Sequence, residues 1–180
     1  MGMKLISIKE KDLELFYKHL EKDFVFEERR SKEDYLKIFK NKHFKPNFIY
    51  DKNLKQIVGY FCFWDFKDFV FGEHFAIFEH LRNNDLGSKF LNYYTSHLKH
   101  PFIGEIEIPN DEITKRRCNY YLKNNFKILK TDYVQPSYHN SKDGVPMYII
   151  GYDRTNKFDF KSHLNKMLNI VYQNVYNINI

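Results

Sequence analysis

The spacing of apolar residues in the first part of the chain predicts a strand followed by two helices. Residues Lys4 to Ile8 alternate as a short strand does, and Lys11 to Phe24 repeat apolar residues at helical spacing. A second helix begins after Ser31, because its hydroxyl suits a helix start and the acidic Asp34 follows three places on. We expect Pro46 to end that element.

The middle of the chain predicts three adjacent antiparallel strands. Asn47 to Tyr50 and Gln56 to Trp64 flank the polar turn DKNLK, a pattern typical of a β-hairpin. Asp65 to Asp68 form a second polar turn. Phe69 to Phe78 follow as the next strand, which is rich in aromatic and β-branched residues.

The second half begins with a helix, a strand and a further helix. Apolar residues recur at helical spacing over 86–99 and again over about Ile113 to Asn124, and between them Phe102 to Ile108 is predicted as a strand. We expect Asn125 to close the second of these helices, since Asn accepts the left-handed conformation that Gly usually supplies there.

The chain then continues with two strands and a C-terminal helix. Phe126 to Tyr133 and Met147 to Asp153 are predicted as strands around the polar loop QPSYHNSKDGVP. Phe160 to Tyr176 has an apolar stripe at helical spacing. We interpret the stripe as the face of a helix docked on the body of the protein, and the alternative is the dimerisation surface of a homodimer.

This order of elements predicts an α/β (α+β) fold. A mixed, mostly antiparallel central sheet of about seven strands, flanked by helices, accommodates it, with an extra C-terminal helix. We expect one domain over residues 1–155 and a C-terminal helical extension over 156–180 that packs on the same domain.

Composition narrows the classes of protein that remain. The chain has 180 residues, of which 43% are hydrophobic and 29% charged, so it is globular rather than disordered. Its net charge of +6 would suit an anionic partner. Because the Lys and Arg residues are scattered, with KRR at 115–117 as the densest group, a small anionic ligand is favoured over nucleic acid.

Two further features bear on compartment and cofactors. Cys62 and Cys118 have no metal-ligand spacing and are expected to be buried free thiols, and no metal site is predicted. The N-terminus lacks an apolar signal core, and no apolar run approaches the roughly 18 residues that span a bilayer. These features favour a cytoplasmic protein without membrane contact.

The strongest chemical signal lies where the Phe69–Phe78 strand passes through Arg82-Asn83-Asn84-Asp85-Leu86-Gly87 into the next helix. A helix that starts after a tight turn has unpaired backbone N–H groups and the positive end of its dipole at that turn. Both suit a phosphate group. The sequence therefore predicts a phosphate-bearing ligand at this turn.

These elements and motifs resemble those of the GNAT (Gcn5-related N-acetyltransferase) superfamily. The phosphate motif of that family is Arg or Gln, two residues, Gly, one residue, then Gly or Ala, and Arg82 to Gly87 match it except that Asp85 replaces the first Gly. EHFAI looks like the family's fourth strand. In NYYLKNNFKIL, Tyr121, Asn125 and Phe126 occupy the family's Tyr, Gly and Phe positions. The resemblance covers roughly Lys4 to Asp153, and IEIP, RRCNYY and YVQPSY are similar to a bacterial subgroup of uncharacterised members.

The resemblance implies an acetyl-CoA-dependent N-acyltransferase that moves an acetyl group to a primary amine of a small molecule or polypeptide. Transfer would be direct, in a ternary complex, without a metal. Acetyl-CoA would lie between the fourth and fifth strands, where a bulge exposes backbone groups. The positions that would bind it are Phe75, Ala76 and Ile77 in the strand, Arg82, Asn83, Asn84, Asp85, Leu86, Gly87 and Ser88 in the turn, and Lys123 at the 3′-phosphate. The Asp85 carboxylate would repel the pyrophosphate unless it turned outward.

Two residues carry the expected chemistry. The resemblance implies that Tyr121 is the general acid that protonates the CoA sulfur, and the alternative is a tyrosine that packs on the sheet. Glu73 is the predicted base, because strict alternation puts it on one face with Phe75 and Ile77, where a desolvated carboxylate would have a raised pKa. The alternative is that the bulge turns Glu73 outward into a surface ion pair.

The acceptor is less determined by the sequence. The segment Glu27-Glu28 would suit a cationic amine, although the adjacent Arg29 and Arg30 are expected to cancel its charge locally. Two alternatives to an enzyme stay open, namely a non-catalytic acyl-CoA-binding or sensing module on the same fold, and a basic nucleic-acid-binding protein with a continuous Lys/Arg face.

Overall fold

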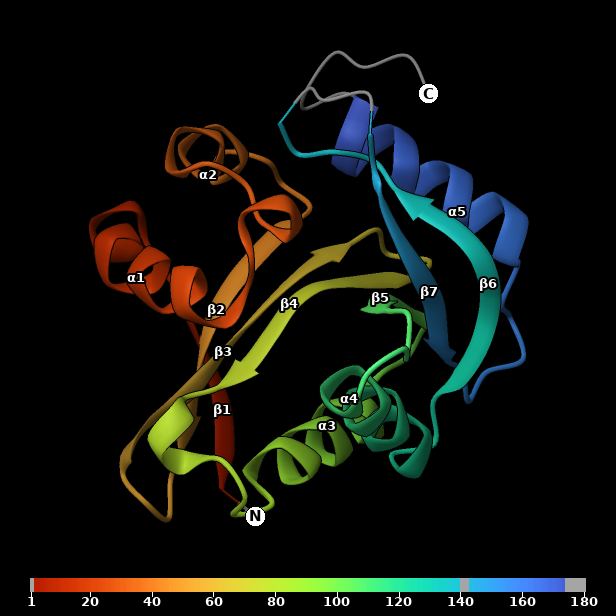
Figure 1. Cartoon of the computed structure of the whole chain (residues 1–180). Helices are drawn as coiled ribbons and strands as arrows, with labels where there is room; N and C mark the ends of the chain where they lie inside the picture. The colour runs from red at the N-terminus through yellow and green to blue at the C-terminus, as the bar shows by residue number, and fades with distance from the viewer. Residues whose placement is uncertain (1, 140–142, 174–180) are drawn as a thin grey trace.

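A computed structural model describes residues 2–139 and 143–173 of the chain (Figure 1). The described residues form one sheet of seven strands in the order β1-β2-β3-β4-β5-β7-β6, and only the β4–β5 pair is parallel. The strands are β1 (Met3–Ser7), β2 (Phe44–Asp51), β3 (Gln56–Asp65), β4 (Val70–Ile77), β5 (Phe102–Glu107), β6 (Lys127–Gln135) and β7 (Val145–Tyr152). This confirms the expected mixed, mostly antiparallel sheet.

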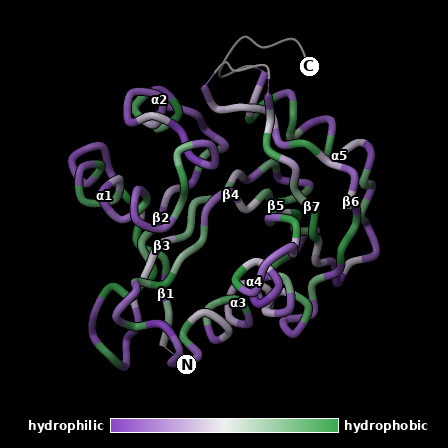
Figure 2. Tube along the Cα trace, in the orientation of Figure 1, coloured by the Kyte–Doolittle hydropathy of each residue, from purple (hydrophilic) through white to green (hydrophobic). Residues whose placement is uncertain are grey.

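Helices cover both faces of the sheet (Figure 1). The α-helices are α1 (Leu13–Asp23), α2 (Lys32–Ile38), α3 (Leu86–His97), α4 (Glu112–Lys123) and α5 (Phe160–Met167). Short 3-10 turns are η1 (Glu10–Asp12), η2 (Phe26–Glu28) and η3 (Glu79–Leu81). Helices α1, α2 and α5 lie on one face, and α3 and α4 on the other, so each face buries its own apolar cluster (Figure 2).

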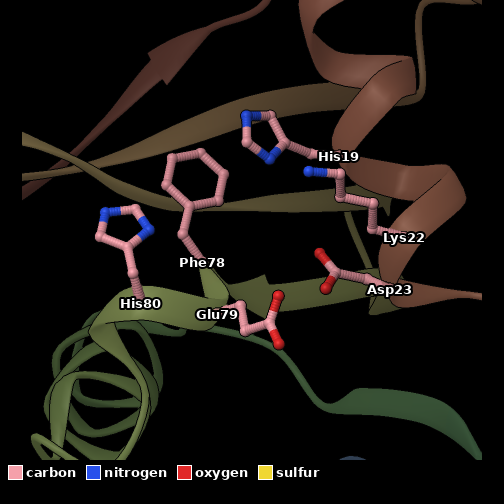
Figure 3. Close-up of a pocket in the computed structure, with 6 residues that line it drawn as sticks. All are labelled: His19, Lys22, Asp23, Phe78, Glu79 and His80. Carbon is pink, nitrogen blue, oxygen red and sulfur yellow. The ribbon is translucent and has the colours of Figure 1, made fainter.

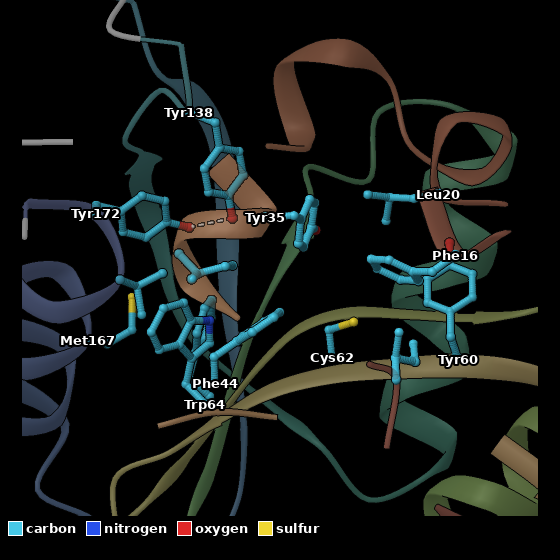
Figure 4. Packing of buried hydrophobic residues seen from close by; sticks show 14 of the residues in the cluster. Phe16, Leu20, Tyr35, Phe44, Tyr60, Cys62, Trp64, Tyr138, Met167 and Tyr172 are labelled. Atoms are coloured by element: carbon cyan, nitrogen blue, oxygen red, sulfur yellow. Dashed lines mark hydrogen bonds between the residues drawn. The ribbon is translucent and has the colours of Figure 1, made fainter. Parts of the chain in front are cut away.

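The first core cluster joins α1, α2 and α5 to the strands beneath them (Figure 4). The ring of Phe16 packs edge-on against Tyr35 and Tyr60, with centroids 5.3 and 5.4 Å apart. Trp64 is also fully buried in this cluster. Aromatic side chains of this size bury much apolar area and dominate the stability of the face.

The second core cluster lies under α3 and α4. Phe90 of α3 packs against Phe61 of β3 and Phe75 of β4, with ring centroids 5.4 and 5.3 Å apart. Cys118 of α4 is buried here, whereas Cys62 is buried in the first cluster, and both are free thiols as expected. These contacts pack α3 and α4 against the strands of this face.

The prediction for Pro46 is wrong. Helix α2 ends at Ile38, and Pro46 lies within β2, opposite Cys62 of β3. The carbonyl of Pro46 accepts a hydrogen bond from the N–H of Ile8, the residue that follows β1. The nitrogen of Pro46 therefore faces the edge of β2 that pairs with β1, just beyond the last β1 residue, Ser7. Strand pairing at that point therefore needs no N–H from the proline.

The C-terminal segment continues from α5 as a wider π-helical stretch, η4 (Leu168–Gln173). Met167, Val171 and Tyr172 of this segment are fully buried in the first core cluster. The apolar stripe thus packs on the sheet as far as Gln173. The last residues of the predicted helix, 174–176, lie outside the described residues.

Candidate active site

The two parallel strands of the sheet diverge after three paired positions. Residues Val70 to Gly72 pair with Phe102 to Gly104, and β5 then continues beside β7 while β4 continues beside β3. At the fork, a Cβ atom on Gly72 would lie 2.3 Å from the ring of Phe102, so only glycine permits this approach. Among the described residues, the edge of β4 beyond Gly72 has no partner strand on the β5 side.

A β-bulge follows at once in β4. Gly72 pairs with Phe63 and His74 pairs with Cys62, which leaves Glu73 as an extra residue with no partner in β3. As a result, Glu73 and His74 both point to the face that carries α1 and α2, where they contact Trp64 and Tyr35. Phe75 and Ile77 pack on the opposite face. The predicted alternation, with Glu73 on the face of Phe75 and Ile77, is therefore wrong.

The bulge also decides which backbone groups reach the open edge. The N–H of Phe78 donates to Val58 of β3 (2.9 Å), and alternation along the strand turns the N–H and C=O of Ala76 to β3 as well. The corresponding groups of Phe75 and Ile77 then face the fork. Of the three strand positions expected to bind acetyl-CoA, two thus offer backbone groups at the fork, and Ala76 does not.

The turn before α3 has the shape that a glycine motif would give. Asp85 is in the left-handed conformation with φ 54°, as is Asn83 with φ 65°. Asp85 is the residue before the first turn of α3, and its side chain makes no capping bond to the helix. The first N–H groups, at Leu86, Gly87 and Ser88, therefore point out of the helix without an intrahelical acceptor. Asp85 therefore adopts the left-handed conformation that glycine usually supplies in such a turn.

The two cationic residues expected to bind the ligand, Arg82 and Lys123, have different surroundings. The Nε atom of Arg82 donates to the carbonyl of Ile77 (3.0 Å), and its terminal nitrogen pairs with Asp23 of α1, so its side chain lies along the end of β4 rather than over the turn. Lys123 is exposed on the last turn of α4. The next residue, Asn124, donates to Ser88 (3.3 Å) and brings that end of α4 to the turn.

Gly87 is tightly packed between α3, α4 and β4. A Cβ atom there would lie 2.8 Å from the hydroxyl of Tyr120 and 3.7 Å from Ile77. The absence of a side chain lets α4 lie directly against the first turn of α3. Asn125 then closes α4 with φ 66°, as predicted.

Tyr121 of α4 packs against the second core cluster. Its ring packs edge-on against Phe126 (5.4 Å between centroids), and no described residue hydrogen-bonds its hydroxyl. Burial raises the pKa of Tyr121 to about 12, with Arg117 opposing this. The phenol is thus protonated at neutral pH and has an unused proton. Arg117 itself pairs with Glu107 of β5.

Glu73 lies in a buried ion pair. Its carboxylate is 2.8 Å from the guanidinium of Arg30, and both side chains are inaccessible to solvent. Trp64 Nε1 and the Tyr138 hydroxyl also donate to it, each at 3.0 Å. Although burial alone would raise the pKa of Glu73, the attraction of Arg30 lowers it below its usual value. The expected raised pKa is therefore not found, and the ion pair is buried rather than on the surface.

A second buried carboxylate, Glu105 of β5, was not singled out by the sequence analysis. It accepts hydrogen bonds from Gln135 (2.6 Å), Tyr172 (2.8 Å) and Tyr133. Burial raises the pKa of Glu105, and these three donors oppose that shift. The available signal was a glutamate inside the otherwise apolar run FIGEI.

The two carboxylates are linked through tyrosines. Tyr138 donates to Glu73 and lies 3.2 Å, hydroxyl to hydroxyl, from Tyr172, which donates to Glu105 (Figure 4). These contacts tie the C-terminal segment to both diverging strands.

A pocket of about 360 Å³ lies beside the end of β4, on the α1 side (Figure 3). It is lined by His19, Lys22, Asp23, Phe78, Glu79 and His80. The rings of His19 and Phe78 stack at 4.1 Å, and Asp23 holds Arg82 at the rim. Charges of both signs line the pocket, which gives it no clear preference for anions.

Two negative findings apply to residues 2–139 and 143–173 alone. No group of three or more His, Cys, Asp or Glu side chains there has the geometry of a metal site. Within the same residues, every helix is too short or too polar to cross a bilayer.

Whole-structure comparison finds solved proteins with a similar fold. A Bacteroides thetaiotaomicron protein assigned to the GNAT family of acetyltransferases matches with a TM-score of 0.82 and 31% sequence identity, over 94% of this chain and 98% of that one. Spermidine N-acetyltransferase from Vibrio cholerae, solved with CoA and spermine, matches with a TM-score of 0.58 and 14% identity over 87% of this chain and 98% of its own. Ard1 from Thermoplasma volcanium has a TM-score of 0.58 and 16% identity, with 84% and 97% covered. No family model and no curated protein matches the sequence.

Proposed function

The chain belongs to the GNAT family of acetyltransferases, and from this premise we propose that it transfers the acetyl group of acetyl-CoA to a primary amine by direct attack in a ternary complex. The observation that carries the proposal is the fork between β4 and β5, with its bulge at Glu73 and the uncapped start of α3 beside it. A thioester with a long pantetheine arm and a pyrophosphate needs an extended edge that ends in N–H donors.

The residues present fit such a ligand. Backbone groups of Phe75 and Ile77 would pair with the pantetheine amides, and the N–H groups of Leu86, Gly87 and Ser88 would hold the pyrophosphate at the positive end of the helix dipole. The 3′-phosphate would lie near Lys123. Asp85 works against binding, since its exposed carboxylate adds negative charge at the turn.

Chemistry at the fork needs three groups. An N–H donor at the bulge would stabilise the oxyanion that forms on the thioester carbonyl, a contribution of about 3 kcal/mol in comparable sites. Tyr121 would give its proton to the departing sulfur, because its phenol is protonated at neutral pH and has no other acceptor among the described residues. A base must take the proton of the amine. Glu73 could do so only if Arg30 withdrew from it.

Calorimetric titration with acetyl-CoA tests the cofactor site. We expect micromolar binding to the wild type and none to Gly87→Glu, whose side chain would collide with Tyr120 and add a charge at the pyrophosphate. Asn92→Glu adds the same charge on an exposed position of α3 and should bind normally. Absence of binding to the wild type would contradict the proposal.

Release of CoA thiol during incubation with a panel of primary amines then tests catalysis. The panel includes spermidine and spermine, because spermine is bound in the Vibrio cholerae relative. Binding of acetyl-CoA without thiol release for any amine would favour the second candidate, a non-catalytic acyl-CoA-binding module. The buried Arg30–Glu73 pair is the feature that keeps this candidate open.

A further inference from the structure

Glu28 on η2 is a half-buried acidic residue beside the bulge of β4. The sequence predicted that Arg29 and Arg30 cancel its charge, and this is wrong. Arg29 donates to the hydroxyl of Tyr17 (2.6 Å) and pairs with Glu21 (3.5 Å). Arg30 is turned into the core. No described residue forms an ion pair or hydrogen bond with the Glu28 carboxylate.

The position of η2 is fixed from two sides. The Nε2 atom of His74, next to the bulge, donates to the carbonyl of Glu28 (2.9 Å). The Nε2 atom of His139 donates to the carbonyl of Phe26 (2.8 Å), and the two rings stack with centroids 3.8 Å apart. Glu28 is therefore held beside the bulged part of β4, between that strand and the segment that follows β6.

The charge of Arg117 acts on both Glu28 and Tyr121. The Glu28 side chain is half-buried, and burial raises the pKa of Glu28 while the positive charge of Arg117 opposes the rise. Arg117 also acts on the phenol of Tyr121, from the same helix. Glu28 on η2 and Tyr121 on α4 therefore both lie within electrostatic range of the Arg117 guanidinium.

We propose that Glu28 is a catalytic residue, which binds the ammonium group of the acceptor and takes its proton before the amine attacks the thioester. This inference rests on the proposed function. It also selects the acceptor, since a carboxylate with no protein partner favours a primary amine that arrives as a cation. The backbone of η2, fixed by His74, holds the base in place, and no described side chain bonds its carboxylate.

The proton balance closes without a further reagent. Glu28 accepts one proton from the ammonium, and the nitrogen lone pair forms the C–N bond to the thioester carbon. As the C–S bond breaks, its electron pair goes to sulfur, which takes the hydroxyl proton of Tyr121. The nitrogen then loses its second proton to the Tyr121 phenolate, and Glu28 releases its proton to solvent.

The test uses Glu28→Gln and Glu28→Asp in the full chain, with Glu33→Gln as the matched control. Glu33 is exposed on the next helix and its replacement makes the same charge change. Acetyl-CoA binding and thermal unfolding are measured for all variants to establish folding. Thiol release is then followed as a function of amine concentration and of pH. The charges that act on the pKa of Glu28, and therefore on this pH profile, are those of Arg117 and Glu27.

We expect Glu28→Gln to bind acetyl-CoA as the wild type does. Its kcat/KM for the amine should fall by about 10²-fold or more, which is the usual contribution of a general base to the rate. Its activity should lose the acid limb of the pH profile, and Glu28→Asp should restore part of the rate. Equal activity of Glu28→Gln and Glu33→Gln would overturn the inference while leaving the proposed function intact. Failure of the wild type on every amine would refute the proposed function instead.

Discussion

The carboxylate of Glu73 and the guanidinium of Arg30 meet at 2.8 Å in a place that solvent does not reach. Arg30 also donates to the carbonyl of Val171 (3.1 Å) and lies over the ring of Tyr138 (4.6 Å to its centroid). Removal of either charge leaves the other buried without its partner, which is far more costly than the loss of a surface pair.

Arg30→Met should therefore destabilise the protein by about 3–5 kcal/mol, measured as the free energy of unfolding in urea. Lys130→Met, which breaks an exposed pair with Asp132, should cost at most about 1 kcal/mol. In the double variant Arg30→Met/Glu73→Gln the loss should be smaller than the sum of the two single losses. Strict additivity would show that the pair is not coupled.

The same pair predicts how stability depends on pH. The pKa of Glu73 in the folded protein is below its usual value of 4.5. The contribution of its charge to folding stability is therefore complete above pH 4.5 and is lost as the pH falls through the lowered pKa. Glu73→Gln should flatten this acid part of the curve, whereas Glu112→Gln, on an exposed position of α4, should keep it. An unchanged acid slope in Glu73→Gln would contradict the assignment.

Asp85→Asn should bind acetyl-CoA more tightly than the wild type. Asn keeps the left-handed turn and removes a negative charge from the positive end of α3, worth about 0.3–1 kcal/mol, or up to roughly fivefold in Kd. Calorimetry at low and high salt measures the gain, which should shrink as salt rises. Asp132→Asn, on the exposed part of β6, should leave Kd unchanged, and weaker binding by Asp85→Asn would refute the argument.

Tyr121→Phe should lower kcat by roughly 10²-fold or more without changing the affinity for acetyl-CoA, because it removes the proton donor to sulfur and leaves the ring packing on Phe126. Since the phenol has a pKa of about 12, its deprotonation should not limit the wild-type rate in the mildly alkaline range. Tyr120→Phe is the neighbouring control. Comparable losses in both variants would indicate a packing effect.

Local features of the fold were predictable because they depend on few residues. Ser31 accepts from the N–H of Asp34 (3.1 Å) as a helix start requires, and Asp85 and Asn125 both adopt positive φ. In each case a short polar side chain or an accessible backbone conformation decides the outcome. The order of strands and helices followed from periodicity for the same reason.

Features that depend on the partner strand were not predictable. The bulge at Glu73 arises from its register against Cys62 and Phe63, and it turns a side chain that alternation assigns to the other face. Pro46 fits within β2 because β1 ends opposite it. Neither fact is present in the local pattern, since both depend on where another strand begins or ends.

The prediction that Arg29 and Arg30 cancel the charge of the neighbouring Glu28 was wrong for a related reason. Arg29 and Arg30 follow Glu28 directly, yet their side chains leave in opposite directions, to Tyr17 and Glu21 on one side and to Glu73 on the other. In an irregular segment such as η2, adjacent side chains diverge, and a local sum of charges does not describe the field at any one of them.

The hydrogen bond from Arg30 to the carbonyl of Val171 also affects how the chain can fold while it is being synthesised. The two residues are separated by 141 positions, and at about 5–20 residues per second the ribosome needs roughly 7–30 s to bring the second after the first. Until Val171 has been made, Trp64 and the Arg30–Glu73 pair have no C-terminal cover. The nascent protein thus spends most of its translation with an incomplete core, and holding that surface apart from other chains is a task for chaperones.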